Sequence, residues 1–275
     1  MTYKTIMVHL DLEQYSEPAL RVTCELADRF KSKVIGVTAG LPNVPIHADG
    51  MIASNVLEAD YEQLNQAIGR CESHFRSALK DFNGALEWRS DAAYPVDFLV
   101  QEARAADLLV VGRAENYNLL GPNHLLEIGD AVMKAGRPVL VVPPRSTSLA
   151  FNRILIAWKD SAEARRALPA ALPLLKRAKE LIIVEITSDE SERGAANERV
   201  ADVAKWLQRH NVPASARVEP SAGAPGSQLE AIASEARADI IVAGAYGHTR
   251  LHEWIFGGVT RHLLQHGSTC ALLVH

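Results

Sequence analysis

The sequence is poor in the features that mark several classes of protein. Its three cysteines, Cys24, Cys71 and Cys270, are too widely spaced to suggest a disulfide framework or a Cys-x2-Cys metal motif, so a reducing compartment is expected. No apolar run approaches the ~18 residues that a membrane-spanning helix requires. The first residues lack the layout of a signal peptide. These absences predict a cytoplasmic protein with no membrane partner.

Basic charge is also scarce. The 29 Lys and Arg residues are outnumbered by 33 Asp and Glu residues, and the formal net charge is −4. Domains that bind nucleic acid usually carry a basic excess and interleave aromatic with basic residues, so no nucleic-acid partner is expected. The Gly-x-Ser-x-Gly elbow and the Gly-x4-Gly-Lys-Ser/Thr loop are both missing. No catalytic residue set is evident, so efficient catalysis is not expected.

The chain contains an internal repeat. Residues 103–112 (ARAADLLVVG) match residues 235–244 (EARADIIVAG), and residues 6–11 (IMVHLD) match residues 154–159 (ILIAWK). The offset between the copies shrinks along the chain, so the first copy carries an extra segment, which we assign to 41–66 as an extended loop leading into a helix. Residues 143–152 have the composition of a linker. The repeat predicts two domains, at 1–145 and 151–275.

Each copy alternates short apolar runs with amphipathic helical segments. The runs are apolar throughout, which is typical of parallel strands covered on both faces. In the helices that follow the first run of each copy, Ser16 is the expected N-cap in the first, and Asp160 with Glu163 forms a predicted capping box in the second. This alternation predicts two tandem doubly wound α/β domains. The expected strands lie at 6–10, 34–37, 86–88, 108–111 and 139–142, and at 154–157, 181–186, 214–218, 240–243 and 271–274.

One glycine pattern in the second copy suggests chemistry. Gly244 follows a predicted strand, Gly247 comes after two further residues, and Gly257 after nine more. Gly258 comes next, and the last helix is expected to run from Thr260 to about 266. Glycines let a backbone approach a ligand closely, and a helix N-terminus offers free N–H groups and positive potential to a phosphate. The same pattern also fits a tight turn followed by a helix that begins on glycine.

This Gly-x2-Gly-x9-Gly spacing resembles the ATP-binding signature of universal stress proteins. The repeated strand starts and the endings PVLVV and ALLVH extend the resemblance over nearly the whole chain, as two domains. The resemblance implies a Rossmann-like five-stranded parallel sheet per domain and an intramolecular pseudo-dimer paired through the last strands. It also implies that the C-terminal domain binds ATP or another adenine nucleotide, and at most slow ATP hydrolysis is expected there. The expected contacts are Ala157, Lys159, Gly244, Gly247, Gly257, Gly258, Val259 and Thr260.

The chain departs from the family pattern at several positions. The family has Ser or Thr where Gly258 stands, and an acidic residue where the second copy has Lys159. Lys159 is either a phosphate partner or a solvated loop lysine. The first copy keeps Asp11 but lacks the glycine spacing after Gly112, and Asp130, an expected helix cap there, would repel a phosphate. We therefore expect a degenerate motif and a structural role for the first domain.

Other interpretations remain open. The chain could be a regulatory scaffold that binds no nucleotide, or a sensor of another small ligand, and it could form a homo-oligomer. His262 and His266 could share a metal at i, i+4 spacing, although solvent-facing or capping histidines are the simpler interpretation. Cys270 is expected to be a small buried side chain, and Trp254 to pack its own loop.

Overall fold

The computed structural model describes residues 2–12, 14, 16–42, 54–113, 123–245 and 258–275. Its first half alternates strands and helices, as the sequence predicts, and most strands extend one to three residues beyond their expected ends. The elements are β1 (Thr5–His9), α1 (Glu17–Phe30), β2 (Lys33–Ala39), α2 (Ser54–Ala78), β3 (Leu86–Asp91), α3 (Pro95–Glu102), β4 (Leu108–Gly112), α4 (Ile128–Lys134) and β5 (Val139–Val142).

The second half repeats this order, which confirms the predicted α/β class. Its elements are β6 (Arg153–Trp158), α5 (Ala162–Leu175), β7 (Glu180–Thr187), α6 (Arg193–Arg209), β8 (Ser215–Pro220), α7 (Pro225–Glu235), β9 (Ile240–Gly244), α8 (Gly258–Gln265) and β10 (Cys270–Val274). Short 3-10 turns follow α3 and precede α6. None of the described helices is long and apolar enough to cross a membrane.

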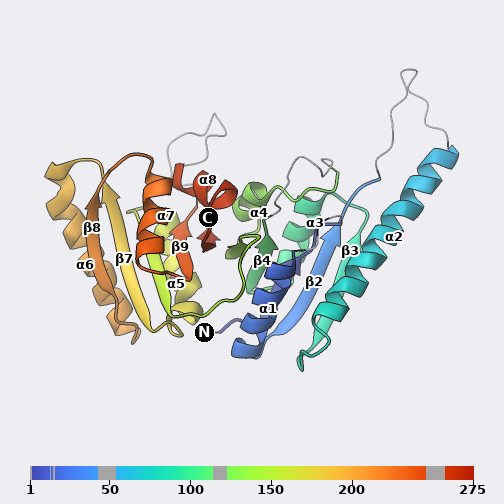
Figure 1. Ribbon diagram of the computed structural model, residues 1–275, viewed down its shortest axis with the longest axis horizontal. Coiled ribbons are helices and arrows are strands. Elements are labelled where there is room, and N and C mark those ends of the chain that lie inside the picture. The colour runs from blue at the N-terminus through green and yellow to red at the C-terminus, as the bar shows by residue number, and fades with distance from the viewer. Residues whose placement is uncertain (1, 13, 15, 43–53, 114–122, 246–257) are drawn as a thin grey trace, which may run out of the picture.

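The described strands form one sheet in the order β3-β2-β1-β4-β5-β10-β9-β6-β7-β8. Within each half all five strands are parallel. The halves meet where β10 pairs antiparallel with β5, with Leu272 opposite Leu140. The two last strands therefore cover each other's edge, and the expected pseudo-dimer through these strands is confirmed (Figure 1).

Helices cover both faces of the sheet, and each face has its own core. Alternate side chains of a strand enter different cores, as Val8 and Met7 of β1 do. Helices α1, α2, α5 and α6 contribute to one core, and α3, α4, α7 and α8 contribute to the other. Burial on both faces explains why the strands are apolar throughout.

The repeated aspartates of the two copies have the same structural task. Asp107 accepts hydrogen bonds from the backbone amides of Lys4 and Thr5, at 2.7 and 2.9 Å. Asp239 accepts the corresponding bonds at the start of β6, at 2.6 and 2.9 Å. Each carboxylate thus satisfies backbone donors at the beginning of the first strand of its half.

Two helix starts differ from their expected caps. Ser16 caps α1 as predicted, by accepting from the backbone amide of Ala19. In α5 the cap is Ser161, not the predicted capping box, because the Ser161 hydroxyl accepts from Ala164 while Asp160 pairs with Arg165. In α4 the N-cap position belongs to residue 127, and Asp130 lies inside the first turn, paired with Lys134. At α5 the cap-type residues Asp160 and Ser161 are adjacent, so local sequence does not distinguish them, whereas α4 begins at a residue that makes no side-chain cap bond.

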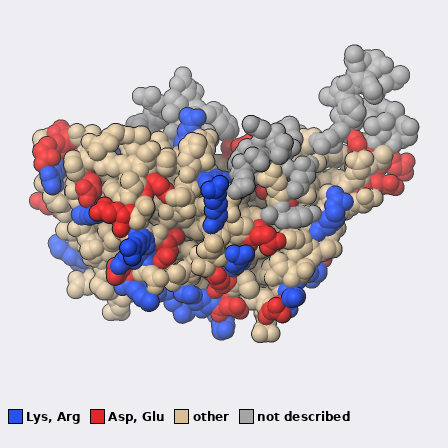
Figure 2. Space-filling view, in the orientation of Figure 1, with Lys and Arg blue, Asp and Glu red and all other residues tan. Residues whose placement is uncertain are grey.

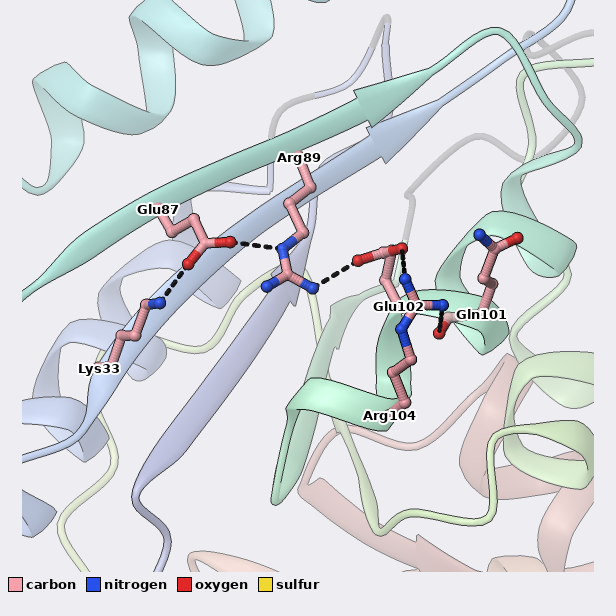
Figure 3. Close-up of polar contacts among 6 residues, drawn as sticks. All are labelled: Lys33, Glu87, Arg89, Gln101, Glu102 and Arg104. Atoms are coloured by element: carbon pink, nitrogen blue, oxygen red, sulfur yellow. Dashed lines mark hydrogen bonds and ion pairs between the residues drawn. The ribbon is translucent and has the colours of Figure 1, made fainter.

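Edge strand β3 carries charged side chains in a continuous chain of ion pairs (Figure 3). Glu87 accepts from Lys33 of β2 and from Arg89, and Arg89 also donates to Glu102 at the end of α3. Arg104 completes the chain on Glu102, at 3.0 Å. These contacts hold α3 against the edge, and the charges disfavour pairing with a foreign strand.

Candidate functional site

The candidate site lies at the carboxyl ends of β6 and β9, which are neighbours in the sheet. After β6 the chain continues into α5 on one face, and after β9 it reaches α8 on the other face. In doubly wound sheets a ligand crevice opens at such a point, beyond the carboxyl ends of the strands. The residues that follow β6, β7 and β9 are therefore the candidates for binding.

Gly244 at the end of β9 serves helix packing in this structure. A Cβ atom at Gly244 would overlap the backbone nitrogen of Ala164 and lie 2.6 Å from the carbonyl carbon of Glu163. At the matching position in the first half, a Cβ at Gly112 would overlap the side chain of Ser16. Because these two positions have no side chain, the first turn of α5 can approach the end of β9, and the first turn of α1 can approach the end of β4. The sequence could have indicated a packing role for Gly244, because the glycine recurs as Gly112 in the copy that lacks the rest of the motif.

The start of α8 is exposed in the part of the chain that the structure describes. Gly258 is its first residue, two positions earlier than expected, and no atom of the described residues lies within 4 Å of a Cβ built on it. Val259 is half-buried, and Thr260 is only 4% exposed, so its side chain belongs to the core. The first N–H groups of any α-helix lack partners within the helix. Gly247 and Gly257 lie outside the described residues, as does Trp254.

Sequence reasoning missed a glycine that positions α8. Gly226 is the second residue of α7, and a Cβ there would overlap the Cβ of His262 and lie 2.9 Å from the carbonyl oxygen of Gly258. The two helices can approach only because this position has no side chain. The pair Pro225-Gly226 could have drawn attention to this position, but such a pair is also ordinary at the start of a helix.

On the opposite side of the crevice, Ala157 and Lys159 lie at the end of β6. Ala157 is half-buried between Val184 and Ala243 of the flanking strands. Lys159 is exposed and forms no ion pair with any described carboxylate. A cation and a helix N-terminus therefore flank the strand ends from two sides.

The corresponding end of the first half is closed. Asp11 matches Lys159 in the repeat, yet Asp11 is only 8% exposed, and the next residue, Leu12, is buried against Leu64 and Cys71 of α2. The matching residues of the second half, Lys159 and Asp160, are both exposed. The counterpart of α2 in the second half is α6, which has 17 residues against the 25 of α2, so the extra segment of the first copy lengthens this helix and supplies Leu64.

Two backbone segments that are joined by hydrogen bonds also cover this end of the first half. The amide of Leu41 donates to the carbonyl oxygen of Asn123 at 3.1 Å, and the His124 ring lies 3.0 Å from the carbonyl oxygen of Leu41. The backbone of Leu126 donates to the Asp11 carboxylate. The first half thus occupies with its own residues the place where the resemblance puts a ligand.

Burial changes the ionisation of two side chains beneath this cover. Burial raises the pKa of Asp11 to about 7, against a smaller opposite effect of the bond from Leu126. Burial lowers the pKa of His9 to about 3. Nδ1 of His9 lies 3.8 Å from Oδ1 of Asp11, so the two groups interact. Both side chains are therefore kept uncharged over most of the acidic and neutral range.

The other candidate residues do not assemble into a metal site. The rings of His262 and His266 are 5.9 Å apart between centroids. Among the residues that the structure describes, His, Cys, Asp and Glu side chains form no group of three that could hold a metal ion. Cys270 is buried, as expected.

The comparisons with known proteins agree with this architecture. A family model described as the universal stress protein family matches residues 2–143 and, a second time, residues 150–275. A universal stress protein from Archaeoglobus fulgidus is 14% identical, with 98% of each chain covered and a TM-score of 0.73. A functionally unknown protein from Pseudomonas aeruginosa is 15% identical, with 99% of this chain and 92% of that chain covered and a TM-score of 0.62. No curated protein matches.

One further similar structure contains a ligand. It is a universal stress protein in complex with cAMP, 24% identical over 52% of this chain and 99% of that chain, with a TM-score of 0.36. An adenine nucleotide thus binds to that protein. For the chain described here, the two matches to the family model together cover almost all residues, and the chain belongs to the universal stress protein family, with two family domains in tandem.

Proposed function

We propose that the C-terminal half binds an adenine nucleotide in the crevice between β6 and β9, and that the chain acts as a binding and regulatory module. The contrast between the two halves supports this most directly. The strand ends of the second half carry the exposed residues Lys159 and Asp160 and an open helix start at Gly258, whereas Asp11 and Leu12 of the first half are covered.

The phosphates are assigned to the first turn of α8. Backbone N–H groups and the positive end of the helix dipole attract an anion there, and the bare Gly258 leaves room for close approach. Lys159 adds a positive charge on the other side of the crevice. Gly247 and Gly257 belong to the same glycine pattern in the sequence, and on that basis we assign them to the phosphate site as well.

The adenine ring is assigned to the apolar lining of the crevice. Ala157, Ile186 and Val259 come from β6, β7 and α8, and all three are only partly buried although each is apolar. Small-molecule sites are mostly apolar, with a few polar groups that set the orientation. The apolar side chains suit the adenine base, and the helix N-terminus with its positive potential suits the phosphates joined to it.

One nucleotide is expected to bind per chain. Among the described residues of the first half, Asn123, His124 and Leu126 cover the strand ends and leave no comparable open cradle. Titration of the full chain with a fluorescent ATP analogue should therefore saturate at one equivalent. Two equivalent sites would show that the cover of the first half opens for ligand. No binding by ATP, AMP or cAMP would favour the scaffold interpretation.

Replacing Gly258 with aspartate is expected to weaken ATP binding at least about tenfold, because a carboxylate would compete for the helix amides and repel phosphate. The fold should persist, since no atom lies within 4 Å of the new Cβ and acidic residues suit a helix N-terminus. Affinity is measured by calorimetric titration, and folding by thermal melting.

Gly194→Asp provides the matched control. Gly194 is the second residue of α6 in the same half, and it is also exposed with no atom within 4 Å of a built Cβ. The same change at the first turn of this other helix should leave ATP affinity unchanged. Equal affinities of the two folded variants would remove α8 as the phosphate site.

A further inference from the structure

Helix α7 contacts α8 near both ends of α8. At the beginning, a Cβ atom on Gly226 would overlap the Cβ of His262 and lie 2.9 Å from the carbonyl oxygen of Gly258. At the far end, Glu230 bonds to the turn that follows α8. Gly226 and Glu230 are four residues apart, so they lie on the same side of α7. This side of α7 therefore fixes both ends of α8, and Figure 1 shows the two helices side by side.

The contact at the far end is a cluster of four hydrogen bonds to one carboxylate oxygen. Oε1 of Glu230 accepts from the backbone amide and the hydroxyl of Ser268, at 2.8 and 2.6 Å. It also accepts from the backbone amide and the hydroxyl of Thr269, at 2.9 and 3.0 Å. Bonds to an ionised acceptor are stronger than those between neutral groups. The other oxygen, Oε2, is buried without a hydrogen-bond partner among the described residues, so Glu230 is directed at this one turn.

Gly267 joins this turn to the last residues of α8. Its backbone amide donates to the carbonyl oxygen of His262 at 2.9 Å, and a Cβ on it would lie only 3.0 Å from the carbonyl oxygen of Leu263. The amide of His266 donates to the same carbonyl of His262, at 2.7 Å. The turn and the helix are therefore one unit, and the bonds to Glu230 hold α8 as well as the turn.

The first half has a different arrangement at this place. The residues between α4 and β5 are 135–138 (AGRP), and none of them carries a hydroxyl group. There Arg137 donates to the carbonyl oxygen of Arg104, in the 3-10 turn after α3, at 3.5 Å. A general requirement of the fold would apply to both halves. The Glu230 cluster therefore points to a task that belongs to the second half.

Long-range charge does not direct phosphates to α8. Figure 2 shows Lys and Arg side chains interspersed with Asp and Glu side chains over this face of the molecule, and the formal net charge of the chain is −4. The attraction of a helix N-terminus for an anion is confined to the first turn and depends on N–H groups that point at the anion. Affinity for phosphates therefore depends on where the first turn of α8 lies.

We propose that Glu230 is a positioning residue for the phosphates of the nucleotide, because it holds the far end of α8 and thereby sets the place and direction of the first turn. This role rests on the proposed binding of a nucleotide at α8. The helix has eight residues and is about 12 Å long, so a tilt at its last turn displaces the amides of its first turn. Glu230 acts through the helix and not by contact with the ligand.

The Glu230→Ala variant is expected to bind ATP at least about tenfold more weakly, because at least one charge-assisted bond to phosphate is lost when the first turn moves. Its affinity for adenosine, which has no phosphate, should stay like that of the wild type. Both affinities are measured on the full chain by calorimetric titration. A general loss of structure would weaken both ligands alike, so the ratio of the two affinities separates positioning from unfolding.

Three further variants make the result specific. Glu230→Gln keeps an acceptor oxygen at the same reach and should recover most of the ATP affinity. Glu235→Ala removes an exposed carboxylate of the same helix and should bind both ligands like the wild type. Ser268→Ala/Thr269→Val removes two of the four donors from the other side of the contact, and it should lower the ATP affinity in the same direction as Glu230→Ala by a smaller factor.

Hydrogen exchange followed by mass spectrometry tests the contact without a ligand. Amides of residues 258–269 should exchange faster in Glu230→Ala than in the wild type, and those of α5 should not change. Unchanged exchange, or an unchanged ratio of ATP to adenosine affinity, would overturn the role of Glu230 while the nucleotide site stands. If exchange responds but the wild type binds no ATP, the nucleotide assignment fails and the positioning role fails with it, although Glu230 holds α8.

Discussion

The Arg199→Met variant is expected to lose about 3–5 kcal/mol of unfolding free energy, because it strands a buried carboxylate. Glu185 of β7 is only 6% exposed, and Arg199 of α6 is its partner. Nε of Arg199 donates to both carboxylate oxygens, at 3.0 and 3.3 Å, and a second guanidinium nitrogen donates as well. Methionine keeps most of the side-chain length but supplies no donor. Urea unfolding followed by circular dichroism measures the change.

Two further variants make this result specific. Arg193→Met removes a cation of the same helix whose partner, Glu190, is exposed, and it should change the unfolding free energy little, because water screens such a pair. Adding Glu185→Leu to Arg199→Met removes the stranded charge and should recover much of the loss. If Arg199→Met were no more damaging than Arg193→Met, the buried pair would not hold α6 on the sheet.

The Asp11→Asn variant is expected to gain stability relative to the wild type as pH rises. Because burial raises the pKa of Asp11 to about 7, the folded chain retains a proton that the unfolded chain loses near pH ~4. The stabilising contribution of Asp11 is complete below about pH 4 and is lost as pH rises to about 7. Over this window the variant should gain about 1.4 kcal/mol per pH unit over the wild type.

His9 hides this dependence in the wild type. Burial lowers the pKa of His9 to about 3, so its contribution is present above about pH 6.5 and is lost as pH falls toward 3. The two slopes oppose each other between about pH 4 and 6.5, and the wild-type curve should be nearly flat there. The variant lacks the Asp11 carboxyl group and should therefore show the slope of His9 alone.

Urea unfolding of both proteins across this pH range measures the difference. Asp28→Asn is the matched control, because Asp28 is an exposed carboxylate in the same half. It measures the effect of replacing a carboxyl group with an amide at an exposed position. A constant difference between Asp11→Asn and the wild type would mean that water reaches Asp11 in the folded state.

The strands could be predicted closely from the sequence, whereas the residues that bury Asp11 at the strand ends of the first half could not. Runs such as 139–142 are apolar at every position, and only a strand buried on both faces suits them. The burial of Asp11 depends on Leu126 and α2, which are distant in sequence and have no local signal. The task of Gly244 depends on how closely α5 approaches β9, which is also a tertiary property.

The candidate site was predictable only in part. The spacing of Gly244, Gly247, Gly257 and Gly258 drew attention to the carboxyl end of the sheet, where strand ends and helix starts alternate. The burial of Thr260 and the role of Gly226 followed from how α8 packs on α7. The binding assignments of the eight candidate residues therefore stay predictions.

The pairing of β10 with β5 has a consequence for synthesis of the chain. The ribosome makes residues 270–274 after every other strand, yet they lie in the middle of the sheet, between β9 and β5. Until they emerge, the first half can fold, but its last strand has an unpaired edge, and such edges promote association between chains. A nascent chain therefore passes through a period in which the β10 of a neighbouring chain could occupy its β5, and two chains could exchange halves.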